Sequence, residues 1–206
     1  MKKDGFMKDA LVLFVITLIA GALLGGAYEL TKGPIEKAQI AASLETYKEV
    51  YADAADFTAD DNLKNAVAGA AEALTASGLS LGRVEVNDAL NAVDGSGNVL
   101  GHIVTVTSKD GYGGNIKLSV GVTNEGAITG LGFLEIAETA GLGMNAKEPA
   151  FKDQFNGKTA EQLVLTKGGA SADDEIDAMS GATVTSTAVV NAVNGALYFV
   201  HNCIGQ

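Results

Sequence analysis

The stretch IKLSVGVTNEGAITGLGFL, residues 116–134, decides the fold that the sequence predicts. Apolar residues alternate with polar or small ones over 116–122, which is the pattern of a half-buried β-strand, and 128–134 is a second short apolar run of strand type. The Asn-Glu-Gly sequence between the two segments is a turn signal. We therefore predict an antiparallel hairpin at this position.

Two further strand patterns precede the hairpin, at 83–86 and at 99–106. The glycine-rich turns DGSGN and KDGYGG separate them, so the segments predict an antiparallel meander. GSGNVLG, residues 95–101, does not fit a dinucleotide-binding fingerprint, because its spacing is G-x-G-x-x-x-G and a strand follows it. We interpret it as part of a hairpin turn.

Helical patterns flank the strands, and Pro34 suits the first turn of the earliest one. An antiparallel sheet with helices packed against it defines an α+β fold. The predicted helices are 35–50, 62–77, 147–154 and 183–203, and 163–166 is a further short strand.

The N-terminal stretch ALVLFVITLIAGALLGGAY, residues 10–28, contains no charged residue. At about 1.5 Å per residue, such a helix just spans a hydrocarbon core of roughly 30 Å. Lys2, Lys3 and Lys8 precede it, which favours a cytoplasmic N-terminus. The alternative is a cleaved signal peptide with small residues near Gly25, but the apolar run is longer than a usual signal core.

We therefore predict a single-pass protein of a bacterial or archaeal cell membrane, anchored in the lipid bilayer. The expected divisions are a cytoplasmic N-terminus (1–9), a transmembrane helix (10–29), a helical linker region (30–80) and an extracytoplasmic domain (81–206).

Composition excludes several classes of function. The net charge of −11 argues against a nucleic-acid partner, which requires a basic face. Cys203 is the only cysteine, so an intramolecular disulfide, a multi-cysteine metal site and covalent haem attachment are excluded. The two histidines lie far apart without ligand spacing. We expect no metal site.

The heptapeptide SGATVTS, residues 180–186, begins the last helical pattern. Its hydroxyls are typical of an ordinary helix cap, which the residues alone favour. The start of a helix is also a natural phosphate site, and the Gly-Ala pair leaves room for a bulky group. Thr185 lies four residues before Val189 and heads the predicted buried face of the helix.

Three ordered motifs resemble one known family. SGATVTS is similar to the flavinylation motif Asp/Ser-Gly-Ala-Thr/Ser-x-Thr, GYGGNI (111–116) to a Gly-Tyr-Gly-Gly-x-Ile hairpin, and ETAGLG (138–143) to a Glu-Thr-Pro-Gly-Leu-Gly loop. The chain resembles the FMN-binding G subunits of Rnf-type ion-translocating ferredoxin:NAD oxidoreductase complexes, which are related to the C subunits of Na⁺-translocating NADH:quinone reductases. Ala140 stands where that family usually has proline, and Ile136 where it often has histidine.

The resemblance implies that FMN is attached by a phosphoester bond to Thr185, with the loop at 138–143 near the flavin ring. A threonine hydroxyl is a poor nucleophile unaided, and nothing near Thr185 in the sequence supplies a base. The family therefore implies a separate flavin transferase that uses FAD. The expected FMN-binding residues are Thr185, Ser180, Gly181, Ala182, Thr183, Glu138, Thr139, Gly141, Leu142 and Gly143.

The implied function is electron transfer within a membrane complex that moves Na⁺ or H⁺, together with the other subunits. No residue is expected to be catalytic in this chain alone. We weigh two kinds of alternative. One is another flavoprotein, either a free-standing extracytoplasmic reductase or the equivalent of the C subunit in a Na⁺-translocating quinone reductase. The other is a non-redox binding domain in which SGATVTS is only a cap.

Overall fold

A computed structural model describes the backbone of residues 3–204 and the side chains of residues 7–25, 28 and 42–204. The first element is a single helix, α1 (Lys3–Val50). By its internal contacts the chain forms two compact units, Met1–Leu44 and Glu45–Gln206. The helix restart expected at Pro34 is not observed, because α1 continues through that residue. A proline inside a helix removes one backbone hydrogen bond and does not always end the helix.

Within α1, the segment Met7–Gly25 is long and apolar enough to cross a membrane, and it is the one such helix among the described residues. The side chains of Lys2, Lys3 and residues 29–41 lie outside the described set. The prediction that the N-terminus is cytoplasmic therefore rests on the distribution of charges in the sequence alone.

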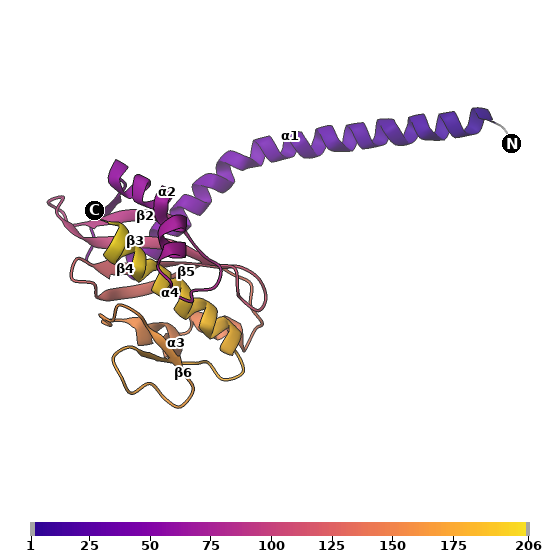
Figure 1. The fold of residues 1–206 in the computed structure, drawn as a ribbon. Helices are drawn as coiled ribbons and strands as arrows, with labels where there is room; N and C mark the ends of the chain where they lie inside the picture. Colours follow the sequence, from indigo (N-terminus) through magenta and orange to yellow (C-terminus); the bar gives the residue numbers. More distant parts are fainter. Residues whose placement is uncertain (1–2, 205–206) are drawn as a thin grey trace. The chain divides into compact units, whose positions relative to one another are not determined.

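The second unit is built on a five-stranded antiparallel sheet with the strand order β1-β2-β3-β4-β5 (Figure 1). Each strand lies beside its neighbour in the chain, so the sheet is the meander that the turn signals predict. The strands are β1 (Asp56–Thr58), β2 (Val84–Val93), β3 (Val99–Ser108), β4 (Ile116–Thr123) and β5 (Ile128–Ile136).

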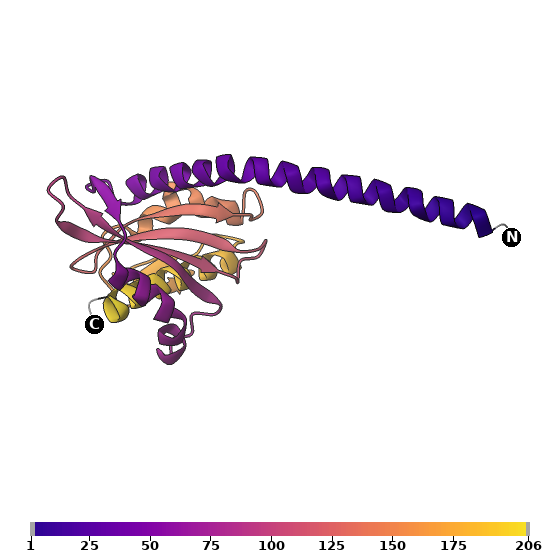
Figure 2. The same ribbon diagram turned by 90° about the horizontal axis from the view of Figure 1, so that it is seen from above.

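One face of the sheet carries the main core, beneath α2 (Asp61–Ala76) and α4 (Thr183–Cys203). Val104 and Val106 of β3 point toward this core, whereas Ile103 belongs to the cluster on the other face, as the pleat of a strand requires. Figure 2 shows α4 lying along one face of the sheet. The buried face predicted for the final helix is confirmed at Val189, Val193, Ala196 and Leu197.

The opposite face of the sheet contacts the end of α1, where Tyr47 and Val50 are buried. This contact is close because β4 and β5 carry glycines there. A Cβ atom at Gly130 would lie 3.1 Å from the Val50 carbonyl oxygen, and one at Gly132 would lie 2.7 Å from the Val50 side chain. Glycine at these positions therefore allows the helix backbone to rest directly on the sheet.

The segment between β5 and α4, residues 137–182, is irregular and contains only short elements, and it closes over the sheet and α4. Asn194 of α4 anchors it, because the buried side-chain amide accepts a hydrogen bond from the Leu163 N–H and donates one to the Leu163 carbonyl. The elements of this segment are η1 (Gly143–Lys147), α3 (Pro149–Lys152), η2 (Asp153–Phe155) and the parallel pair β6 (Val164–Thr166) and β7 (Glu175–Asp177).

The α+β fold that the sequence predicts is confirmed, and the structure adds two strands. The segment 30–80, expected as a helical linker, also contains β1. Leu63 and Leu74 of α2 lie in the main core, and residues from Glu45 onward belong to the same compact unit as the sheet. β7 is the second unexpected strand, and its three residues are too few to show a period.

A pocket at the start of helix α4

Helix α4 begins without a side-chain cap. Its N-cap residue is Ala182, and no side chain accepts a hydrogen bond from the first turn. The expectation that SGATVTS supplies an ordinary Ser or Thr cap is therefore wrong. The first N–H groups of a helix have no partner inside the helix and carry a partial positive charge. At α4 they are left for a ligand or for water.

The hydroxyls of the motif have separate roles. The buried Ser186 Oγ accepts a hydrogen bond from the Met179 N–H and donates one to the Ala182 carbonyl, each at 3.0 Å, so it fixes the turn before the helix. Thr183 is half-buried, and Thr185 is only 1% exposed. The buried position predicted for Thr185 is confirmed.

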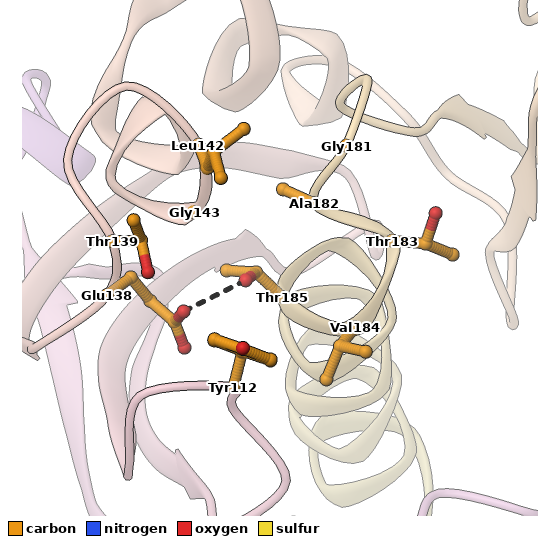
Figure 3. Close-up of a pocket in the computed structure, with 10 residues that line it drawn as sticks. All are labelled: Tyr112, Glu138, Thr139, Leu142, Gly143, Gly181, Ala182, Thr183, Val184 and Thr185. Carbon is orange, nitrogen blue, oxygen red and sulfur yellow. Dashed lines mark hydrogen bonds between the residues drawn. The ribbon is translucent and has the colours of Figure 1, made fainter.

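A pocket of about 490 Å³ lies at this end of α4. It is formed by the first turn of the helix, the loop that follows β5 and the loop between β3 and β4, as Figure 3 shows. None of its lining residues is basic. They are Tyr112, Glu138, Thr139, Leu142, Gly143, Gly181, Ala182, Thr183, Val184 and Thr185.

Glu138 and Thr185 face each other in this pocket (Figure 3). The Thr185 hydroxyl donates a hydrogen bond of 3.1 Å to Glu138 Oε2. The other carboxylate oxygen, Oε1, accepts a hydrogen bond of 3.2 Å from the Gly113 N–H. The sequence indicated no base near Thr185 along the chain, and the fold places a carboxylate beside it.

Glycines make this approach possible. A Cβ atom at Gly143 would lie 2.6 Å from both Glu138 Oε2 and Thr185 Oγ1. Gly181 has a φ of +73°, a left-handed conformation that glycine adopts without strain, and its Cβ would lie 3.2 Å from Leu142. The backbones of both loops therefore come close to Thr185 without a side chain between them.

Most of the residues that the sequence nominated lie together in this pocket. Ser180 lines a different cavity, next to Met179 and Gln154, and Gly141 does not line this pocket. Tyr112 and Val184 line it although the set of nominated residues omitted them. Tyr112 belongs to the GYGGNI motif, and this motif could have identified it as a site residue. No sequence feature could have identified Val184, because only the structure shows that its position in the first turn of α4 faces the pocket.

Neither histidine nor the cysteine lies among the residues that line this pocket. His102 and Cys203 line a separate cavity with Asp60 and Asn91. In the part of the chain that the structure describes, no group of three or more His, Cys, Asp and Glu residues could hold a metal ion.

The antiparallel sheet, the uncapped α4 and the pocket at the start of that helix are features of a cofactor-binding class of domain, and residues 111–198 match the FMN-binding domain family. The chain is 32% identical over 199 residues to the G subunit of the Na⁺-translocating ferredoxin:NAD⁺ oxidoreductase complex of Acetobacterium woodii, covering 95% of this chain and 91% of that protein. It is 33% identical over 201 residues to the G subunit of an ion-translocating oxidoreductase complex of Methanosarcina acetivorans, covering 94% and 93%.

A solved structure, NqrC of Shewanella oneidensis, is similar with a TM-score of 0.47 and 23% identity, covering 57% of this chain and 61% of that chain. The similarity to the G subunits extends over nearly the whole length of both partners. This chain therefore belongs to the family of G subunits of ion-translocating oxidoreductase complexes. The resemblance that the three sequence motifs indicated is confirmed.

Proposed function

We propose that this protein carries FMN covalently, through a phosphoester bond to the Thr185 hydroxyl oxygen, and that it transfers electrons within a membrane-bound ion-translocating oxidoreductase complex. Family membership supports the redox role. The observation that carries the attachment site is the position of Thr185: its hydroxyl lies in a pocket at the open N-terminus of α4.

The residues present fit FMN. The pocket volume of about 490 Å³ lies within the usual range for small-molecule sites, roughly 300–1,000 Å³. Leu142, Val184 and Tyr112 supply apolar and aromatic surface for a flavin ring, and each is at least 43% exposed. The first N–H groups of α4 suit a phosphate. Gly181 and Ala182 add little side-chain bulk at that point.

The absence of basic residues from the lining explains why a covalent bond would be needed. Phosphate sites commonly use Arg or Lys to hold the charge, and this pocket offers only the helix terminus, with Glu138 nearby. A phosphoester would retain the cofactor without a cationic clamp. The bound flavin would supply the electron-transfer chemistry, and the residues of the chain would hold and orient it.

The membrane context follows from α1 and from the family. The apolar segment Met7–Gly25 and the relatives from membrane complexes indicate a membrane protein. We propose that the N-terminus is cytoplasmic and that the FMN domain lies on the extracytoplasmic side, because Lys2, Lys3 and Lys8 precede the uncharged run of residues 10–28. The partners would be the other subunits of the complex, the lipid bilayer and a flavin transferase that donates FMN from FAD.

The attachment is tested by intact-mass analysis and peptide mapping of protein made in a host that contains the flavin transferase. The wild-type chain should gain the mass of one FMN less water, on the peptide that contains Thr185. Thr185→Ala should lose this mass, and Thr187→Ala should keep it. Thr187 is the matched control, because it is exposed two residues further along the same helix. Covalent flavin that persists on Thr185→Ala would refute the assignment.

A further inference from the structure

Both oxygens of the Glu138 carboxylate have a defined partner. Oε2 accepts the hydrogen bond from the Thr185 hydroxyl at 3.1 Å, and Oε1 accepts the one from the Gly113 N–H at 3.2 Å. The proton of the Thr185 hydroxyl therefore already points at a carboxylate. These distances are within the reach that a general base needs.

Close packing fixes the carboxylate in this position. A Cβ atom at Gly111 would lie 2.7 Å from Glu138 Oε1, and one at Gly143 would lie 2.6 Å from Oε2. Glycines on two different loops thus pack against opposite oxygens of the same group. Glu138 itself is only half-buried, so solvent can take up a proton that it receives.

Few other groups in the pocket could accept that proton. Of the ten lining residues, Glu138 is the only one with a carboxylate, and none is a histidine or a lysine. Thr185 is 1% exposed, so a base on another protein would have to enter the pocket to reach its hydroxyl. The entering phosphorus atom would occupy that same space.

We propose that Glu138 is the general base for the attachment of FMN to Thr185. This inference rests on the proposed function. As the Thr185 oxygen forms its bond to the FMN phosphorus of FAD, the phosphoanhydride bond of FAD breaks and AMP leaves. The hydroxyl proton passes to Glu138 and from there to solvent. No electron is transferred to or from an external partner in this step.

This role makes the chain an active participant in its own modification. A threonine hydroxyl requires activation before it attacks phosphorus. In this assignment the flavin transferase binds and orients FAD, while the acceptor protein supplies the base. The N-terminus of α4 would meanwhile stabilise the negative charge on the phosphoryl oxygens.

The test measures the initial rate of covalent FMN transfer onto the purified full-length apo-protein in detergent, with purified flavin transferase and FAD. The readout is the intact mass of the protein, so no activity of the flavin-loaded protein is needed. Glu138→Gln keeps the shape of the side chain but removes the base. We expect its kcat for transfer to fall by roughly 10²- to 10⁴-fold, with an unchanged KM for the acceptor chain.

Two further variants separate a base from a structural role. Glu138→Asp retains a carboxylate and should recover part of the rate. Glu138→Ala should be accelerated by added formate, which can enter the vacated space and accept the proton. The transfer rate of Glu138→Gln should also rise more steeply with pH than that of the wild type, because hydroxide replaces the lost base. Glu135→Gln is the matched control, since Glu135 is an exposed carboxylate on β5, three residues before Glu138.

The outcomes distinguish a failure of the general-base assignment from a failure of the proposed function. A wild-type chain that gains no covalent FMN would refute the proposed function. A wild type and a Glu138→Gln variant that gain FMN with equal kcat would leave that function standing and refute the base. If Glu138→Gln fails to fold, formate rescue of Glu138→Ala and the rate of Glu138→Asp decide the question: no rescue by formate, together with an Asp variant as slow as Glu138→Ala, would refute the assignment.

Discussion

The Thr185 hydroxyl donates a hydrogen bond of 3.1 Å to Glu138 Oε2, across a separation of 47 residues in the chain. Thr185 belongs to the first turn of α4, and Glu138 follows the end of β5. The contact joins two of the three motifs that carry the family resemblance. Gly113, from the third motif, donates its N–H to the same carboxylate. The three motifs therefore form one site around one side chain.

Gly143→Ala should disrupt the contact between Glu138 and Thr185. The added methyl group would lie 2.6 Å from both Glu138 Oε2 and Thr185 Oγ1. Either the hydrogen bond breaks or the loop moves, at a cost of about 1–3 kcal/mol in the free energy of unfolding. We expect FMN attachment, measured by intact mass, to fall sharply.

Gly168→Ala is the matched control for this substitution. Gly168 is also a loop glycine, but a Cβ atom there meets nothing within 4 Å. It should leave both attachment and stability close to the wild type. Equal attachment in Gly143→Ala and the wild type would mean that the contact seen between Glu138 and Thr185 is not needed.

Asn194→Ala should destabilise the segment that precedes α4. The amide of Asn194 pairs with both backbone groups of Leu163, and both residues are 2% exposed. Removing it leaves a buried N–H and a buried carbonyl without these partners, at a cost of roughly 2–5 kcal/mol. Denaturant unfolding of the full chain in detergent measures the loss.

An exposed asparagine on the same helix provides the comparison. Asn202 donates only to the Tyr198 carbonyl at the surface. Asn202→Ala should change the free energy of unfolding by less than about 0.5 kcal/mol. If the two variants were equally stable, the buried amide pairing could not be an anchor.

His102 should make the folded domain sensitive to mild acid. Burial lowers the pKa of His102 from its usual value of 6.5, and the nearby Asp60 carboxylate opposes this only in part. Below pH 6.5 the unfolded chain therefore binds more protons at this residue than the folded chain does. The free energy of unfolding should fall as the pH drops below about 6.5. Well above that value, where His102 is neutral in both the folded and the unfolded chain, it should contribute no slope.

Melting temperatures across this pH range test the effect. His102→Gln should flatten the loss on the acid side, whereas His201→Gln, at an exposed histidine of α4, should leave it intact. The pKa of Asp110 is lowered, mainly by the hydrogen bond from the Arg83 backbone N–H. Protonation of this carboxylate therefore adds a separate loss of stability, but only at more acid pH. An unchanged slope in His102→Gln would show that other groups cause the sensitivity.

The N-terminal helix should remain part of the mature protein. The intact mass of membrane-extracted protein should correspond to the complete 20.9 kDa chain plus FMN. Loss of the residues up to about Gly25 would instead identify a cleaved signal peptide. Labelling of a cysteine introduced before Met7 by a membrane-impermeant reagent, only after the cells are opened, would support the cytoplasmic N-terminus.

The sequence predicted the parts of the fold that have a strong period. The strands β3 to β5 are rich in apolar and β-branched residues between clear turn signals, and α4 carries a continuous apolar face, so these elements were found close to their observed bounds. β1 was missed because Asp56–Thr58 is short and polar at its ends, and only its pairing with Asn91–Val93 makes it a strand. Such pairing is decided by tertiary contacts.

The candidate site was predictable in its members but not in its geometry. The three motifs identified the residues, yet nothing in the sequence indicated that Glu138 would accept the hydrogen bond of Thr185. The capping expectation failed because the N-cap residue is Ala182, which has no side-chain acceptor, while the Ser186 hydroxyl, inside the helix, bonds to the Met179 N–H and the Ala182 carbonyl. Local propensity favours a hydroxyl as a cap, and only the fold shows where each hydroxyl is already engaged.

Ala182 at the head of α4 has a consequence for how the protein matures. The ribosome delivers a chain whose last helix still has open N–H groups at its first turn. Under the proposed function, the phosphate of FMN would satisfy them, so the loaded protein should melt at a higher temperature than the empty one. Biosynthesis of the protein would then finish after translation. A host without the flavin transferase would produce only the less stable, FMN-free protein, and its proteases would degrade this form faster than the FMN-loaded one.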